Sequence, residues 1–191
     1  LFLNESFATT TEKEGSVIAE DITTALYEEV QTKYADEIWS FRQEILECDA
    51  EDEDQFAGCL SLDESKSAEE WITICQLRKN EETCEQTGTA VPSHIYLAVR
   101  KSDDKVVGVI DLRHHTNHPI LGTWGGHCGY SVRPSERGKG YAKEMLRLNL
   151  ENAKAIFGCN EEEALKLSPE NKQILIAFSD IVASIRNLVF K

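Results

Sequence analysis

The fold is decided by the stretch GYSVRPSERGKGYA, residues 129–142, which places two glycines where a strand turns into a helix. Gly138 and Gly140 have no Cβ, so the backbone there can approach a ligand closely. The first N–H groups of the following helix have no acceptor within the helix, and they lie at the positive end of its dipole. The stretch therefore predicts a pyrophosphate site, with a tight turn that binds nothing as the alternative.

On both sides of this stretch, the pattern of apolar residues predicts regular structure. From Lys139 to Ile156, apolar residues recur at spacings of three and four, which indicates a long amphipathic helix. The segments His94–Arg100 and Lys105–Leu112 are rich in Ile, Val, Leu and Tyr and are separated by a polar turn, which predicts a β-hairpin. A further strand is expected within residues 125–132.

Two more helices are expected before the hairpin. Apolar residues at helical spacing between Ile38 and Leu46 predict the first helix, with Thr32 as its cap. Ser67 caps the second helix, which has Trp71 on its packing face. A short strand is expected at residues 25–30, ahead of both helices.

The bulk composition predicts one globular domain with an acidic surface. The chain has 191 residues, a net charge of -14 and no apolar run that approaches a membrane span. The negative charge disfavours nucleic acid and anionic membranes as partners. The acidic run Asp49–Gln55 is either a solvated loop or a segment that attracts a basic amine or peptide. Six cysteines without a CxxC pair indicate reduced thiols and a cytoplasmic location.

The longer run GYSVRPSERGKGYAKEML resembles motif A of the GNAT superfamily of acetyl-CoA-dependent N-acetyltransferases, written Q/R-x-x-G-x-G/A. Gly138 and Gly140 match its glycines, and Ser135 stands at the Q/R position. The resemblance covers about residues 25–157 and includes HIYLAVRKSDDKVVGVIDLRH, which is similar to the second and third strands of the family. It implies an α+β fold with a mixed, mostly antiparallel central sheet flanked by helices.

The same resemblance implies a cofactor site and a reaction. Residues Tyr130, Ser131 and Val132 would line the pantetheine arm, and the pyrophosphate would be held by Arg137, Gly138, Lys139, Gly140, Tyr141 and Ala142. An amine of a small molecule or protein would attack the thioester of acetyl-CoA directly, and a strand amide would stabilise the oxyanion. A catalytically inactive CoA-binding or protein-interaction module with a GNAT-like fold is the alternative.

Candidates for the general base are His127 and Asp111, because both are expected on or beside strands that face the cleft. Each could instead hydrogen-bond a loop. Side chains of metal-ligand type gather in sequence at His114, His115, His118, His127 and Cys128, but their spacing fits no zinc pattern and no metal is expected. Cys128 is not expected to act as a nucleophile, because no base and acid are arranged around it.

Three segments are expected along the chain: an N-terminal arm at residues 1–23, a GNAT-like acetyl-CoA-binding domain at 24–158, and an atypical helical C-terminal segment at 159–191. The usual second half of the family is not recognisable in the last segment. Three alternatives stay open: its helix replaces the missing wall of the cleft, a partner chain supplies that wall, or the wall is lost together with activity. The apolar stripe from Ile174 to Leu188 is either core or the seam of a homodimer.

Overall fold

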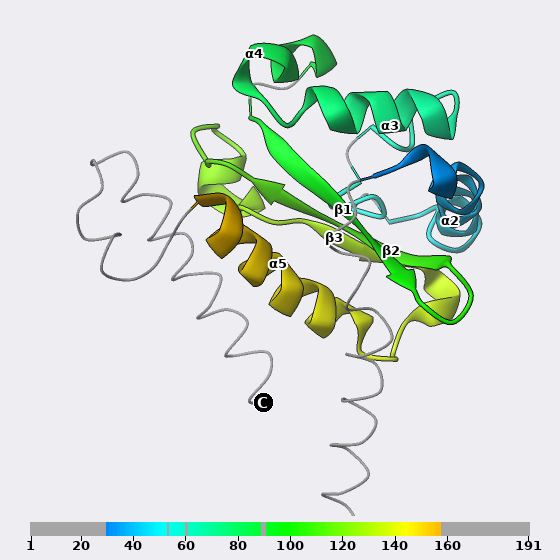
Figure 1. The fold of residues 1–191 in the computed structure, drawn as a ribbon. Helices are drawn as coiled ribbons and strands as arrows, with labels where there is room; N and C mark the ends of the chain where they lie inside the picture. The colour runs from blue at the N-terminus through cyan, green and yellow to red at the C-terminus, as the bar shows by residue number, and fades with distance from the viewer. Residues whose placement is uncertain (1–29, 53, 60, 89–90, 158–191) are drawn as a thin grey trace, which may run out of the picture.

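The protein is an α+β domain with a three-stranded antiparallel sheet, in the order β1-β2-β3, and helices on both faces (Figure 1). The structure is a computed structural model and describes residues 30–157, apart from residues 53, 60, 89 and 90. The predicted fold class is confirmed. The expected N-terminal arm, the strand at 25–30 except for its last residue, and the C-terminal segment 159–191 lie outside the described residues.

The predicted hairpin forms within one residue of its expected limits. Strand β1 spans Ser93–Arg100 and strand β2 spans Lys105–Arg113, with Tyr96 opposite Ile110. Nearly every residue of both strands is buried, as expected for a sheet covered on two faces. Continuous runs of Ile, Val and Leu are therefore stable here without a polar face.

One face of the sheet is covered by helix α2, Ala35–Cys48, and helix α3, Ala68–Leu77, while the short helix α4, Glu81–Cys84, follows α3 (Figure 1). The apolar positions that predicted these helices form the core on this face. Its buried side chains include Ile38, Phe41, Ile45, Trp71, Cys75, Ile95, Leu97, Val99 and Val109.

The structure confirms one of the two expected helix caps. The Ser67 side chain accepts a hydrogen bond of 3.3 Å from the Glu70 N–H, so its prediction as a cap is confirmed. The prediction for Thr32 is wrong. Thr32 is the first residue of a 3-10 turn, Thr32–Tyr34, and helix α2 begins after this turn without a side-chain cap. The 3-10 turn has its own i→i+3 backbone hydrogen bonds, so the α-helical hydrogen bonds of α2 begin only after the turn.

Replacing the cap of α3 tests its contribution to stability. Ser67→Ala is expected to lower the free energy of unfolding by about 1 kcal/mol, because the Glu70 N–H loses its acceptor. Urea unfolding followed by circular dichroism measures the change. Ser67→Asp is the matched control, since its carboxylate can accept the same bond; an equal loss in both variants would contradict the capping role.

The other face of the sheet is covered by helix α5, Tyr141–Phe157. Met145 packs so close to β2 that a Cβ at Gly108 would lie 2.6 Å from its sulfur. The helix begins two residues later than the expected Lys139, because Gly140 adopts a φ of +88° that no helix residue has. No helix in the described part of the chain is long and apolar enough to span a membrane.

Strand β3 is shorter than expected and spans only Tyr130–Val132. The prediction of a strand within residues 125–132 is wrong at its start, because the strand begins only at Tyr130. Leu121–Gly125 forms a single π-helical turn, and Gly126 follows it with a φ of +61°, outside the β region. The chain therefore enters the sheet only after the turn has ended.

Candidate functional site

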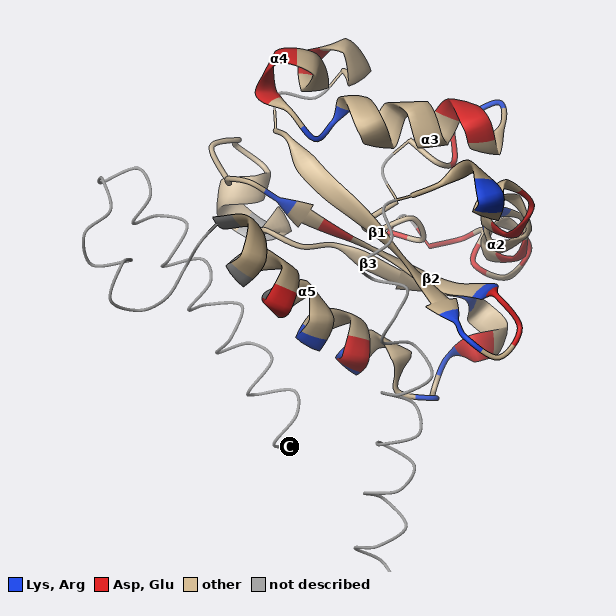
Figure 2. Ribbon diagram, viewed as in Figure 1, with Lys and Arg blue, Asp and Glu red and all other residues tan. Residues whose placement is uncertain are grey.

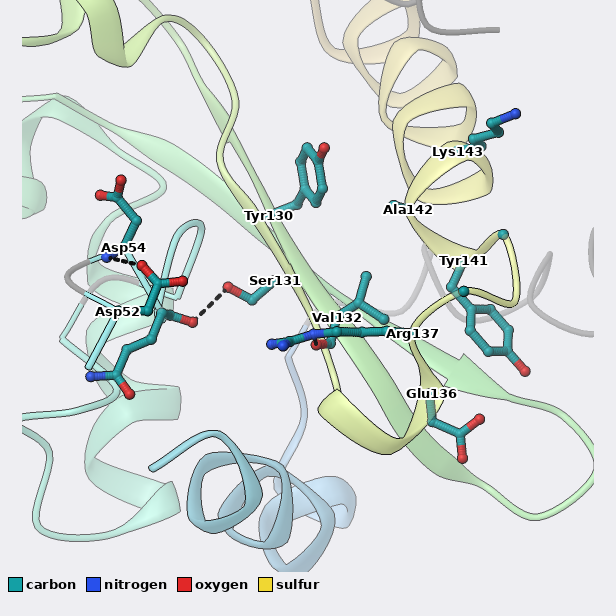
Figure 3. A pocket seen from close by; sticks show the side chains of 13 residues that line it. Asp52, Asp54, Tyr130, Ser131, Val132, Glu136, Arg137, Tyr141, Ala142 and Lys143 are labelled. Atoms are coloured by element: carbon teal, nitrogen blue, oxygen red, sulfur yellow. Dashed lines mark hydrogen bonds between the residues drawn. The ribbon is translucent and has the colours of Figure 1, made fainter. Parts of the chain in front are cut away.

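A cavity of about 620 Å³ lies between β3, the start of α5 and the loop that follows α2 (Figure 3). It is lined by eight of the nine residues expected to bind the cofactor: Tyr130, Ser131, Val132, Arg137, Gly138, Gly140, Tyr141 and Ala142. Lys139 is the ninth and does not line it. The wall also contains Gln55, Glu136 and Lys143, which were not predicted as part of the site. Asp52 and Asp54 line it as well, and they belong to the acidic run that was expected to be either a solvated loop or a segment that attracts a basic amine or peptide.

The glycine loop leaves backbone amides available at one end of the cavity. Gly138 has a φ of +78°, and a Cβ there would meet no atom of the described residues within 4 Å. The first hydrogen bonds of α5 run from the N–H groups of Lys143 and Glu144 to the Gly140 carbonyl. Among the described residues, no acceptor binds the N–H groups at positions 138 and 140–142. These free donors at a helix N-terminus fit a diphosphate.

The structure also decides the register of the glycine motif. The register with Gly138 and Gly140 departs from the pattern Q/R-x-x-G-x-G/A at Ser135, whereas Arg137, Gly140 and Ala142 satisfy it fully two residues later. All three of these residues line the cavity. Ser135 does not, and its N–H instead donates to Glu44 on α2 at 2.7 Å. The later register therefore fits the site, and in that register the Q/R position is occupied by an arginine.

Strand β3 presents an open backbone edge to the cavity. Asp111 N–H donates to the Gly129 carbonyl and Arg133 N–H donates to the Val107 carbonyl, so the odd-numbered residues around β3 face β2. In an antiparallel pair the neighbouring residues then point their N–H and C=O groups the other way. Tyr130 and Val132 therefore direct their backbone groups away from β2. The Val132 carbonyl accepts from Arg137, and the other groups can pair with an extended ligand.

The Arg137 side chain crosses the cavity beside β3 (Figure 3). Its Nε donates to the Val132 carbonyl at 3.1 Å, and its guanidinium binds both carboxylate oxygens of Asp49 at the end of α2. The hydrogen bond from Arg137 holds the pKa of Asp49 below its usual value. Asp49 already neutralises this cation, so Arg137 contributes little net positive charge to the cavity. Its side chain contributes mainly hydrogen-bond donors and part of the cavity surface.

Lys139, which lies outside the cavity lining, takes part in an ionic cluster around Glu136. The Glu136 carboxylate binds Lys139 at 2.7 Å, Arg100 at 2.8 Å and Lys105 at 3.2 Å. Burial acts to raise the pKa of Glu136, but these hydrogen bonds and charges lower it to about 2. The cluster ties the glycine loop to the β1–β2 hairpin.

The Glu136 cluster predicts how stability changes with pH. The pKa of Glu136 is lowered from 4.5 to about 2, so its contribution is present above pH 4.5 and is lost as pH falls through 2. Glu136→Gln is expected to cost about 2 kcal/mol at pH 7, less than the full shift implies because the Lys139 side chain is half exposed. Urea unfolding at pH 7 and pH 3 measures it. If the difference in free energy of unfolding between Glu136→Gln and the parent were as large at pH 3 as at pH 7, the prediction would be contradicted.

Neither expected general base lines the cavity. Asp111 is only 3% exposed, and its carboxylate accepts hydrogen bonds from the Arg113 side chain at 2.9 Å and from the Gly129 N–H. Burial raises the pKa of Asp111, while Arg113 opposes that rise. The backbone carbonyl of His127 accepts from the Arg113 N–H at 2.9 Å. These contacts hold the chain entering β3 in place, and the structure does not bring either side chain to the cavity.

Cys128 and the histidines form no second reactive centre in the described residues. Burial raises the pKa of Cys128 to about 12, so the thiol stays protonated although the Asn149 amide, which donates to its sulfur at 3.4 Å, acts to lower that pKa. His114 lies against His94, with 2.7 Å between their ring nitrogens, and burial lowers its pKa to about 4. Within residues 30–157 as described, no three His, Cys, Asp or Glu side chains gather as a metal site.

The fold and the cavity define an α+β domain in which the edge of β3 and the N-terminus of α5 line one cavity. The model of the acetyltransferase (GNAT) family matches residues 67–175, more than half of the chain, and the chain therefore belongs to this family. The match begins at the cap of α3 and continues beyond the end of α5. No curated protein and no solved structure matches the chain significantly.

Proposed function

We propose that the protein is an N-acetyltransferase that moves the acetyl group of acetyl-CoA to an amine of a small molecule or protein. One observation carries the proposal: free amides at the start of α5 and the open edge of β3 line the same cavity. A diphosphate needs the first feature and the amide groups of pantetheine need the second. Acetyl-CoA contains both groups, separated along one chain.

The residues of the site have separate tasks in this proposal. The N–H groups of Gly138, Gly140, Tyr141 and Ala142 bind the diphosphate. Tyr130 and Val132 pair with the pantetheine amides and place the thioester along β3. An outward N–H of β3 stabilises the oxyanion that develops when the amine attacks the carbonyl carbon. The amine loses its proton to water or to a carboxylate of the cavity wall, and no covalent enzyme intermediate forms.

Two measurements test the proposal on the full chain. Isothermal titration with acetyl-CoA and with CoA tests binding, and a thiol-release assay against a panel of amines tests turnover. Binding together with thiol release supports the acetyltransferase. Binding without release from any amine supports the inactive CoA-binding module, and absence of binding contradicts both functions.

A further inference from the structure

The outward edge of β3 is already bonded to a side chain at one point. Arg137 Nε donates to the Val132 carbonyl at 3.1 Å, and Figure 3 shows the Arg137 side chain lying across the strand there. The guanidinium also binds both carboxylate oxygens of Asp49, one of them at 2.8 Å. Arg137 and Asp49, bonded to each other and to this carbonyl, are here named the strap. The strap takes the acceptor of Val132 that faces away from β2.

The strap competes with an extended ligand for β3. A strand or ligand that pairs fully with one residue uses both the N–H and the C=O of that residue. Tyr130 and Val132 both direct these groups outward, but the Val132 carbonyl is held by Arg137. A pantetheine arm that pairs along the whole edge therefore has to release the bond from Arg137 Nε.

Arg137 is the member of the strap that can move. Its side chain is 48% exposed, whereas that of Asp49 is 12% exposed. Asp49 is the C-cap of α2, and its N–H donates to the Ile45 carbonyl at 2.8 Å, so the helix fixes its position. The long arginine side chain borders the open cavity. Opening the strap therefore means that the guanidinium leaves and the carboxylate stays.

The charges around the strap explain where the guanidinium rests without a ligand. Figure 2 shows acidic residues along α2, and Asp49 lies at the C-terminus of this helix, where the dipole also favours a cation. Asp52 and Asp54 line the cavity beside it. A diphosphate that enters the cavity meets these negative charges. Its binding is more favourable if Arg137 turns from the carboxylate to the phosphates.

We propose that acetyl-CoA opens the strap by an exchange of partners, in which the guanidinium of Arg137 leaves Asp49 and the Val132 carbonyl and binds the diphosphate. The exchange rests on the proposed function. Arg137 directly precedes Gly138, where the amides proposed for the diphosphate begin. Its planar guanidinium can donate two parallel bonds to a phosphate, as it does to the carboxylate. The phosphate end of the ligand thus frees the strand edge on which its thioester lies.

Acetyl-pantetheine separates the two halves of this exchange, because it has the thioester and amides of acetyl-CoA but no phosphate and no charge. Arg137→Met removes both the strap and the cation that would bind the diphosphate. The variant is expected to bind acetyl-pantetheine about threefold more tightly than the parent does, and acetyl-CoA about tenfold more weakly. Isothermal titration of the full chain measures acetyl-CoA, and saturation-transfer NMR measures the weaker acetyl-pantetheine.

Arg147→Met is the matched control. Arg147 is 46% exposed, pairs with Glu144 on its own helix, and lies outside the cavity lining. This variant is expected to bind both ligands as the parent does.

A second variant isolates the role of Asp49 as a positioning residue. Asp49→Asn is expected to tighten acetyl-pantetheine binding about twofold, because a loosened Arg137 releases the Val132 carbonyl more readily. The same change is expected to have no effect on this uncharged ligand when Arg137→Met is already present. The double variant is still expected to bind acetyl-CoA more weakly than the parent, since it lacks the guanidinium.

The exchange is overturned if Arg137→Met tightens both ligands, weakens both, or leaves the affinity for acetyl-pantetheine unchanged. Parent-like affinity for acetyl-CoA in the double variant would overturn it too, because repulsion by Asp49 would then explain the loss in Arg137→Met. Each of these results leaves acetyl-CoA binding to the parent in place. Absence of that binding would instead overturn the proposed function.

Discussion

Gly138→Glu is expected to abolish binding of acetyl-CoA, with a loss of affinity of about 100-fold or more. A Cβ added at position 138 would contact no described residue, at the end of the cavity where the amides at positions 138 and 140–142 have no acceptor in the described part of the chain. A carboxylate there would occupy the place proposed for the diphosphate and repel what remained of it. Isothermal titration of the folded variant with acetyl-CoA measures the loss.

Two controls separate charge from backbone strain in this experiment. Gly138→Gln imposes the same strain at a φ of +78° but has no charge, so it is expected to bind more tightly than the glutamate variant. Gly88→Glu places the same side chain at a φ of +77°, also in open space, on a turn outside the cavity lining, and is expected to bind as the parent does. Parent-like affinity in Gly138→Glu would contradict the assignment of the phosphate end.

Arg133→Met is expected to lower the free energy of unfolding by about 3 kcal/mol. The Arg133 side chain is 2% exposed, packs over the Phe41 ring, and donates at 2.6 Å to the Val106 carbonyl. Its guanidinium also binds Glu37 and Glu44 of α2, each at 3.1 Å. Methionine fills part of the volume but leaves the buried Val106 carbonyl without this donor and removes the cation that pairs with Glu37 and Glu44. Urea unfolding at pH 7 measures the change.

Arg137→Met is the matched comparison for that variant. Arg137 also pairs with an acidic residue near α2, Asp49, but its side chain is 48% exposed. Water replaces the lost donor at an exposed site, so the free energy of unfolding is expected to change by less than about 1 kcal/mol. Equal losses in the two arginine variants would show that burial does not decide the strength of these pairs.

The regular elements that pack the core could be predicted from their residue pattern. Periodic apolar residues predicted helices α2, α3 and α5, and Ser67 predicted the start of α3. The boundaries were less predictable where glycine or a 3-10 turn intervened. Gly126 shortens β3, and the turn at Thr32 delays α2, because backbone dihedrals at these points are set by neighbouring contacts as well as by the residue type.

The candidate site could be predicted in part. The predictable part is formed by a single continuous stretch of sequence. Residues 130–142 supply the strand edge and the glycine loop, and eight of the nine expected cofactor residues line the cavity. The part of the cavity lining that comes from the loop after α2 lies more than 70 positions earlier, and Ser131 joins that loop to β3 across this separation. A hydroxyl that binds two distant carbonyls leaves no signal in sequence spacing.

What the sequence by itself determined is local: the hairpin, the amphipathic helices, and a glycine turn that exposes amides at the start of α5. Hydrophobic periodicity and the absence of a Cβ are sufficient for these features. The tertiary structure alone decided which charges meet. It buried Asp111 on β2, paired Arg137 with Asp49, and brought Asp52 and Asp54 to the cavity. Packing of α2 and α3 on the sheet sets these distances, which the order of residues does not contain.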